Sequence, residues 1–164
     1  MYRFRPIVCV ALTALAAVLI ARPVAASEEV PFTGSFDGVV SHSPVDPVTD
    51  AVLVQAAGNA NHLGQFAVIV PHLVNTPTRT AAGHYEFTAA NGDKVYADFT
   101  GTAQPTATPG VIAIVETATI TGGTGRFAGA TGTFVVQRLY DRIAGTTTGS
   151  FEGTITSPGA NGQK

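Results

Sequence analysis

The chain has 164 residues, of which 45% are hydrophobic, and a formal net charge of −2 from 9 basic and 11 acidic side chains. Binding of nucleic acid or of anionic lipid headgroups depends on clustered Lys and Arg, so this sparse, slightly acidic charge argues against both partners. The single cysteine, Cys9, has no intramolecular partner. The fold must therefore be held together by burial and backbone pairing, without disulfides.

The N-terminal segment has the pattern of a secretory signal peptide. Arg3 and Arg5 precede the apolar run PIVCVALTALAAVLIA. The small residues Val24 and Ala26 occupy the positions before the cleavage site that a signal peptidase recognises. The apolar run is shorter than the about 20 residues that a spanning helix needs, which favours cleavage over an uncleaved membrane anchor. We predict cleavage after Ala26 and a secreted, extracytoplasmic protein that has no membrane partner once the signal is removed.

The remaining chain, Ser27 to Lys164, has the usual length of one domain. Its six basic and eleven acidic residues give a formal charge of −5. We predict one β-barrel domain over residues 27–156 and a disordered tail over residues 157–164.

This region contains no amphipathic helix, but many short runs rich in Val, Ile, Thr, Phe and Tyr that Gly, Pro and Asn separate. Short connections favour antiparallel neighbours, because a parallel pair needs a crossover of about a dozen or more residues. The sequence therefore predicts an up-and-down meander. Its eight strands are expected at residues 31–40, 50–57, 62–73, 82–90, 94–104, 111–121, 131–141 and 147–156.

The first and last predicted strands carry nearly the same hexapeptide, TGSFDG at Thr33 to Gly38 and TGSFEG at Thr148 to Gly153. Chance in a chain rich in Gly and Thr is one explanation. The other is that the two strands lie side by side, with Phe36 and Phe151 filling the interior and glycines relieving strain in coiled strands. Closure would also remove exposed sheet edges, so we favour a closed eight-stranded antiparallel barrel over an open sandwich.

The turn after the fourth strand can be predicted from side-chain alternation. A two-residue Asn91-Gly92 turn would set the core face of one strand against the solvent face of the other. A three-residue loop, with Gly92 in the left-handed region, pairs Phe87 with Val95 and keeps both apolar faces inward. We predict the three-residue loop.

The glycine-rich stretch TGGTGRFAGATG, from Thr121 to Gly132, fits a dinucleotide-binding pattern. Such a site needs a following helix whose N-terminus holds the pyrophosphate, and here the next run, TGTFVVQRLY, is another strand. The stretch is therefore predicted to be a barrel corner, with a single helical turn near Arg126 and with Phe127 plugging the barrel end. The sequence implies no cofactor.

Glu116 and Arg138 are candidate functional residues because each shares the face of its strand with apolar side chains. If the corner pairs Ile120 with Phe134, Glu116 lies directly opposite Arg138. The first interpretation is a structural ion pair near a barrel mouth, and the second is a pair at the bottom of an apolar cavity that orients a ligand. The third is that both side chains face water.

The histidines and serines do not form a pattern that predicts a metal site or a nucleophile. His62 and His72 share the parity of one strand but lie about 33 Å apart if it is extended, too far to share a metal. His42 and His84 have no metal-ligating neighbours at ligand spacing, so we predict no metal site. A G-x-S-x-G nucleophile motif is absent from the sequence.

Four segments together resemble the bacterial exported proteins described as allene oxide cyclase barrel-like. They are GNANHLG (58–64), TAANGDKVYADFTGT (88–102), ITGGTGRFAGATGTF (120–134) and TGSFEGTI (148–155). The corner is the most specific of these, and plant dirigent proteins carry a similar corner in a similar barrel. The resemblance implies a calycin-like barrel around an apolar cavity. No catalytic position of the plant enzyme allene oxide cyclase can be matched to a residue of this chain. The resemblance therefore does not carry over that enzyme's activity.

We therefore expect a secreted barrel that binds a small apolar ligand, with no catalytic activity assigned. One alternative is an isomerase or cyclase of the allene oxide cyclase or dirigent type that acts by confinement, with Glu116 as the candidate catalytic group. Another is a ligand-free extracellular structural protein. The sequence leaves the oligomeric state open. The candidate ligand-binding residues are Glu116, Arg138, Tyr140, Phe66, Phe87 and Phe99.

Overall fold

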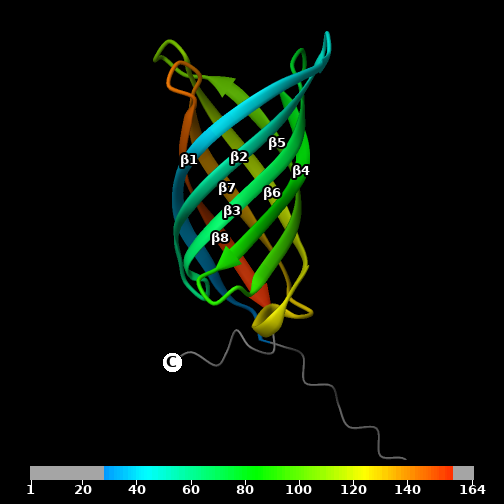
Figure 1. Cartoon of the computed structure of the whole chain (residues 1–164), viewed down its shortest axis with the longest axis vertical. Helices are drawn as coiled ribbons and strands as arrows, with labels where there is room; N and C mark the ends of the chain where they lie inside the picture. Colours follow the sequence, from blue (N-terminus) through cyan, green and yellow to red (C-terminus); the bar gives the residue numbers. More distant parts are fainter. Residues whose placement is uncertain (1–27, 157–164) are drawn as a thin grey trace, which may run out of the picture.

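The computed structural model describes residues 28–156, which form a closed antiparallel barrel in which β8 pairs with β1 (Figure 1). The strands are β1 (Val30–Asp46), β2 (Thr49–Ala60), β3 (Gly64–Asn75), β4 (Thr80–Ala89), β5 (Lys94–Pro105), β6 (Val111–Gly123), β7 (Thr131–Asp141) and β8 (Thr146–Thr156). The predicted all-β, eight-stranded, up-and-down barrel is confirmed. The expected cleavage site and tail lie outside the described residues.

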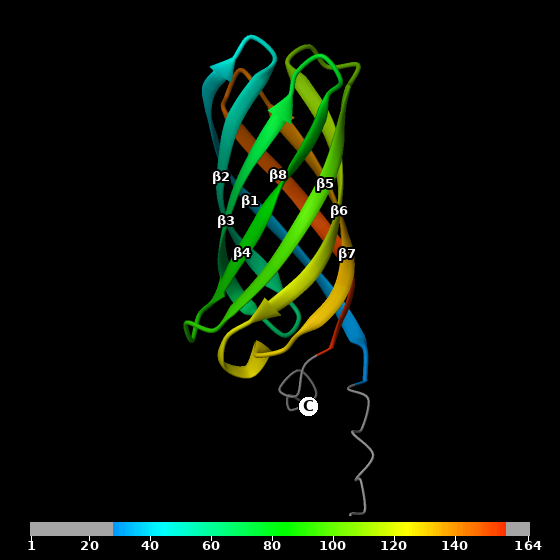
Figure 2. The same cartoon turned by 90° about the vertical axis from the view of Figure 1, so that its right-hand side faces the viewer.

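The two ends of the barrel differ (Figures 1 and 2). One end carries the short helix η1 (Gly125–Phe127) and both ends of the described chain, and we call it the η1 end. The opposite end, which we call the mouth, is formed by the connections at residues 47–48, 76–79, 106–110 and 142–145. Within residues 28–156, no helix is long and apolar enough to cross a membrane.

Aromatic rings fill the half of the barrel next to the η1 end. The ring of Phe32 lies 4.9 Å from that of Phe151 and 5.5 Å from that of Phe134, measured between centroids. Phe87 packs in the same cluster, and Phe127 of η1 is fully buried as the predicted plug. Burying one such ring contributes about 1.5 to 3 kcal/mol, so this half supplies much of the stability of the fold.

The repeated hexapeptides lie side by side as predicted, and their glycines make room for these rings. Gly34 pairs with Phe151, and Phe36 pairs with Gly149, across the β1–β8 ladder. A Cβ atom on Gly34 would lie 2.6 Å from the Phe151 ring. Glycine therefore stands opposite phenylalanine because the narrow barrel has no space for two side chains at that level.

The predicted turn between β4 and β5 is also confirmed. Phe87 pairs with Val95, and the Ala89 N–H donates to the Asp93 carbonyl oxygen at 2.9 Å, which closes a three-residue loop. Gly92 has a φ of 87°, the left-handed conformation that the loop requires.

The predicted register of β6 and β7 was wrong by two residues. Ile120 pairs with Gly132, not with Phe134, and Glu116 therefore pairs with Val136. The ladder extends further into the corner because Gly132 adopts a φ of 142° and passes close to β8, where an added Cβ would lie 2.2 Å from the Thr154 carbonyl oxygen. Side-chain parity is unchanged by a shift of two residues, so Glu116 and Arg138 still point inward as predicted.

Candidate functional site

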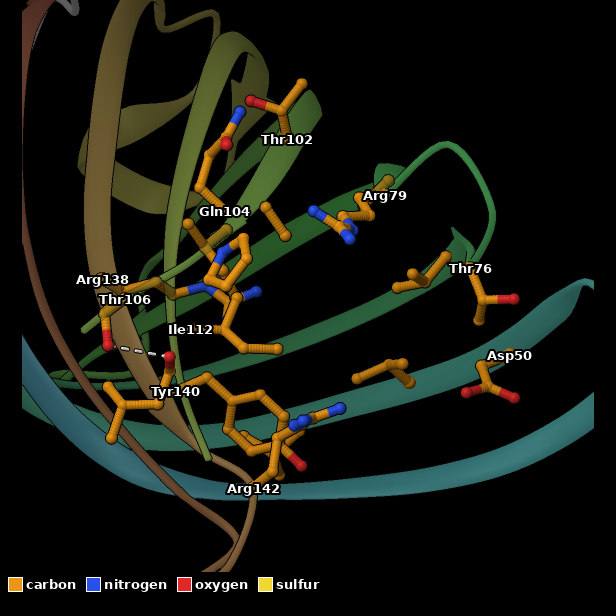
Figure 3. A pocket seen from close by; sticks show the side chains of 18 of the residues that line it. Asp50, Thr76, Arg79, Thr102, Gln104, Thr106, Ile112, Arg138, Tyr140 and Arg142 are labelled. Atoms are coloured by element: carbon orange, nitrogen blue, oxygen red, sulfur yellow. Dashed lines mark hydrogen bonds between the residues drawn. The ribbon is translucent and has the colours of Figure 1, made fainter. Parts of the chain in front are cut away.

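The mouth half of the barrel encloses a cavity of about 440 Å³ (Figure 3). Its walls are largely aliphatic, with Val52, Val74, Ile112 and Ile114 among the lining residues. This volume lies in the range of small-molecule sites, which are concave, mostly apolar and carry a few polar groups. The polar and charged side chains that line it include His42, Asp50, His72, Arg79, Arg138, Tyr140 and Arg142.

A buried ion pair forms the floor of the cavity. The Arg138 Nη2 donates to Glu116 Oε1 at 2.8 Å, and Nε donates to Oε2 at 3.2 Å. The Tyr85 hydroxyl donates to the same carboxylate from below. Glu116 is 0% exposed, whereas Arg138 lines the cavity. The carboxylate therefore acts behind the guanidinium and fixes its orientation, in the manner of a bidentate pair.

Glycines on neighbouring strands create the space for this floor. Gly101 pairs with Glu116, Gly149 pairs with Arg138, and in each case an added Cβ would lie 2.6 Å from the partner's side chain. Gly83 stands opposite His72 in the same way, with a clash at 2.3 Å. The long polar side chains can cross the barrel only because their neighbours have none.

Burial and charge set the protonation of the floor. Burial raises the pKa of Tyr85 well above its usual range, and the Glu116 charge raises it further, so the hydroxyl stays a donor. Burial alone would lower the pKa of Arg138, but the charge and hydrogen bonds of Glu116 outweigh it and raise the pKa. Glu116 and Arg138 therefore form an ion pair with little net charge.

His72 completes the floor as a neutral side chain. Burial lowers its pKa, and the positive charge of Arg138 lowers it further, against the effect of a hydrogen bond to the Val70 carbonyl. The Nδ1 atom lies 2.9 Å from that carbonyl oxygen and is therefore the protonated nitrogen. The Nε2 atom is left as an acceptor.

A second polar pair lies nearer the mouth. The His42 Nε2 and the Tyr140 hydroxyl are 2.6 Å apart, and Asp50 Oδ2 lies 4.0 Å from His42 Nδ1. Burial raises the pKa of Tyr140, so the phenol remains protonated at neutral pH. The arrangement places a hydroxyl and an imidazole against an apolar cavity, where they can orient an oxygen atom of a ligand or exchange a proton with it.

The structure places only some of the predicted ligand-binding residues at the cavity. Arg138 and Tyr140 line the cavity, and Glu116 lies directly beneath Arg138. Phe99 packs under His72, with ring centroids 5.6 Å apart. Phe66 and Phe87 belong to the aromatic cluster of the η1 half and do not line the cavity.

Sequence reasoning missed Tyr85, His72 and His42 as members of the site. Alternation identified Tyr85 as inward-facing, but gave no sign that it shares a level with Glu116. His42 and Tyr140 are 98 positions apart in the sequence, and only barrel closure brings them together. Over residues 28–156, no group of three His, Cys, Asp or Glu side chains is placed to hold a metal ion.

Comparison with known proteins identifies the architecture. A solved structure of a pterocarpan synthase dirigent protein aligns with this chain at a TM-score of 0.56 and 12% sequence identity. The alignment covers 89% of this chain and 97% of that protein. At this identity the likeness shows a shared dirigent-like barrel fold and does not show shared chemistry. No family model matches the sequence, and no curated protein matches it either.

Proposed function

We propose that this protein binds a small, mostly apolar molecule in the cavity of the mouth half and does so outside the cytoplasm. The observation that carries the proposal is the contrast between the cavity of about 440 Å³ and the tightly packed aromatic cluster in the other half of the same barrel. A purely structural barrel gains stability by filling its interior, because unfilled volume is destabilising. The signal-like residues 1–26 support the location.

A second candidate function is isomerisation or cyclisation of the bound molecule. The His42–Tyr140 pair and the Arg138 guanidinium line the same cavity, so donors and a proton acceptor converge on one enclosed volume. The structural neighbour is described as a pterocarpan synthase, which is consistent with a reaction in such a barrel. Binding is the part of the proposal that both candidates share.

Fluorescence titration with the neutral probe N-phenyl-1-naphthylamine tests binding. We expect a saturable signal with one probe per chain. Ala103 faces inward opposite Ile114 at the cavity wall, so Ala103→Phe fills the cavity and should abolish the signal while the midpoint of thermal unfolding stays near that of the wild type. Equal probe binding by the wild type and by folded Ala103→Phe would contradict the proposal.

A further inference from the structure

The cavity gathers positive charge on an acidic protein. Residues 28–156 contain five Lys and Arg residues, and three of them, Arg79, Arg138 and Arg142, line the cavity. Of the eleven acidic residues in the same range, only Asp50 lines it. The charges of the cavity therefore oppose those of the molecule as a whole, and their potential attracts negatively charged molecules.

The three arginines are not equivalent. The charge of Arg138 is balanced by Glu116 at the floor. Within residues 28–156, neither Arg79 nor Arg142 has a carboxylate within 4.0 Å. They belong to the connections after β3 and β7, and Figure 3 shows both side chains beside the cavity. Uncompensated positive charge thus lies at the mouth, and a balanced ion pair lies at the floor.

Arg79 has an unfavourable backbone conformation. Its φ is 56°, a left-handed conformation that glycine or asparagine adopts more easily. Its carbonyl oxygen accepts a hydrogen bond from Ala103 N–H at 2.9 Å, which fixes the turn against β5. An arginine at such a position is unfavourable for the turn itself, and strained positions of this kind are concentrated at functional sites.

The ion pair at the floor indicates which chemical group can lie at the inner end of the cavity. The Nε and Nη2 atoms of Arg138 donate to Glu116, and the guanidinium also lines the cavity. The ion pair thus offers an N–H to the cavity without adding net charge. A neutral oxygen, such as a carbonyl or ether, suits this end better than a second anion, because Glu116 already balances the guanidinium.

Resting on the proposed binding function, we propose that the ligand is a compact organic anion. Its negative group is held at the mouth by Arg79 and Arg142, its apolar body lies against the aliphatic walls, and a neutral oxygen accepts a hydrogen bond from Arg138. The floor and the aromatic cluster close the barrel below, so the body must fit within the mouth half.

Two probes with the same aromatic body test this assignment. N-phenyl-1-naphthylamine is neutral, and 8-anilino-1-naphthalenesulfonate carries one negative charge. We compare their dissociation constants for wild type, Arg79→Gly, Arg142→Gln and the control Lys94→Gln at low ionic strength. Lys94 lies next to the η1 end and pairs with Glu86, so its replacement removes one positive charge away from the cavity.

We expect Arg79→Gly and Arg142→Gln each to weaken binding of the anionic probe about three- to tenfold, as for loss of one charge-assisted contact at a solvated site. Binding of the neutral probe should stay within twofold of the wild type, and Lys94→Gln should change neither. Glycine adopts the left-handed conformation easily, so we expect Arg79→Gly to remain folded.

Three outcomes would overturn the proposal, and they can be told apart. If wild type binds the neutral probe in the cavity but the arginine variants bind both probes as wild type does, the anion assignment is wrong and the binding function stands. If wild type binds neither probe, the binding function fails and the anion assignment fails with it. Equal weakening of both probes would show that the arginines act through structure and not through charge.

Discussion

The η1 half and the mouth half of this barrel are built from the same eight strands, yet one is filled and the other is hollow. In the η1 half, glycines stand opposite phenylalanines, and the rings interlock around Phe32. At the boundary, glycines stand opposite Glu116, Arg138 and His72. Beyond it, small and β-branched residues leave a cavity of about 440 Å³. Glycine placement therefore serves packing in one half and a polar floor in the other.

This division suggests that stability and binding are separable along the barrel axis. The aromatic cluster contributes apolar burial, whereas the floor contributes orientation at the cost of removing two charges from water. Variants in the two halves should consequently change different measurements.

Removing one partner of the floor ion pair should have the largest effect. Arg138→Ala leaves Glu116 buried without its counter-charge and should lower the free energy of unfolding by about 3 to 5 kcal/mol in urea denaturation. The double variant Glu116→Leu/Arg138→Met removes both charges and should be more stable than Arg138→Ala. A double variant less stable than the single one would mean that the pair itself, and not its imbalance, determines stability.

Truncating the aromatic cluster should affect stability without affecting binding. Phe87→Ala removes a fully buried ring and should lower the free energy of unfolding by about 3 to 5 kcal/mol. Probe affinity of the folded fraction should remain that of the wild type, because Phe87 does not line the cavity. A loss of affinity comparable to that of Ala103→Phe would show that the two halves are coupled.

A change of pH is expected to have a smaller effect on the free energy of unfolding. Burial lowers the pKa of His72, so the unfolded chain binds a proton more readily than the folded chain as pH falls below about 6.5, the ordinary value for histidine. The contribution of neutral His72 to the free energy of unfolding is complete above that pH. It declines as the pH falls toward the lowered pKa of the folded state. His72→Gln should flatten this part of the stability profile relative to wild type. Identical profiles for the two proteins between pH 5 and 7 would refute the assignment.

The fold was predictable because it follows from local patterns. Alternation of apolar and polar residues placed Glu116 and Arg138 on the inner face, and the paired hexapeptides indicated that β8 closes on β1. The β6–β7 register was not predictable, because Gly132 extends the ladder through a backbone conformation that alternation does not reveal. A shift of two residues preserved the face but changed the contact from directly opposite to diagonal.

The site was less predictable than the fold. Arg79 and Arg142 lie in connections, outside the alternating pattern, and their position at one cavity depends on the closure of all eight strands. Whether the interior is filled or hollow depends on the summed side-chain volume at each level of the barrel. That volume can be predicted only when the register of every pair of strands is known. Phe66 and Phe99 face the same interior, yet neither lines the cavity, because level and not face decides access to it.

The central claim is that the mouth half holds a small molecule. A crystal structure of the protein grown with N-phenyl-1-naphthylamine tests it most directly. We expect the probe to lie between the aliphatic wall at Ile112 and the floor at Arg138, with the Glu116–Arg138 pair intact. A cavity that contains only water, or that has closed by side-chain movement while the probe lies on the outer face of the strands, would contradict it.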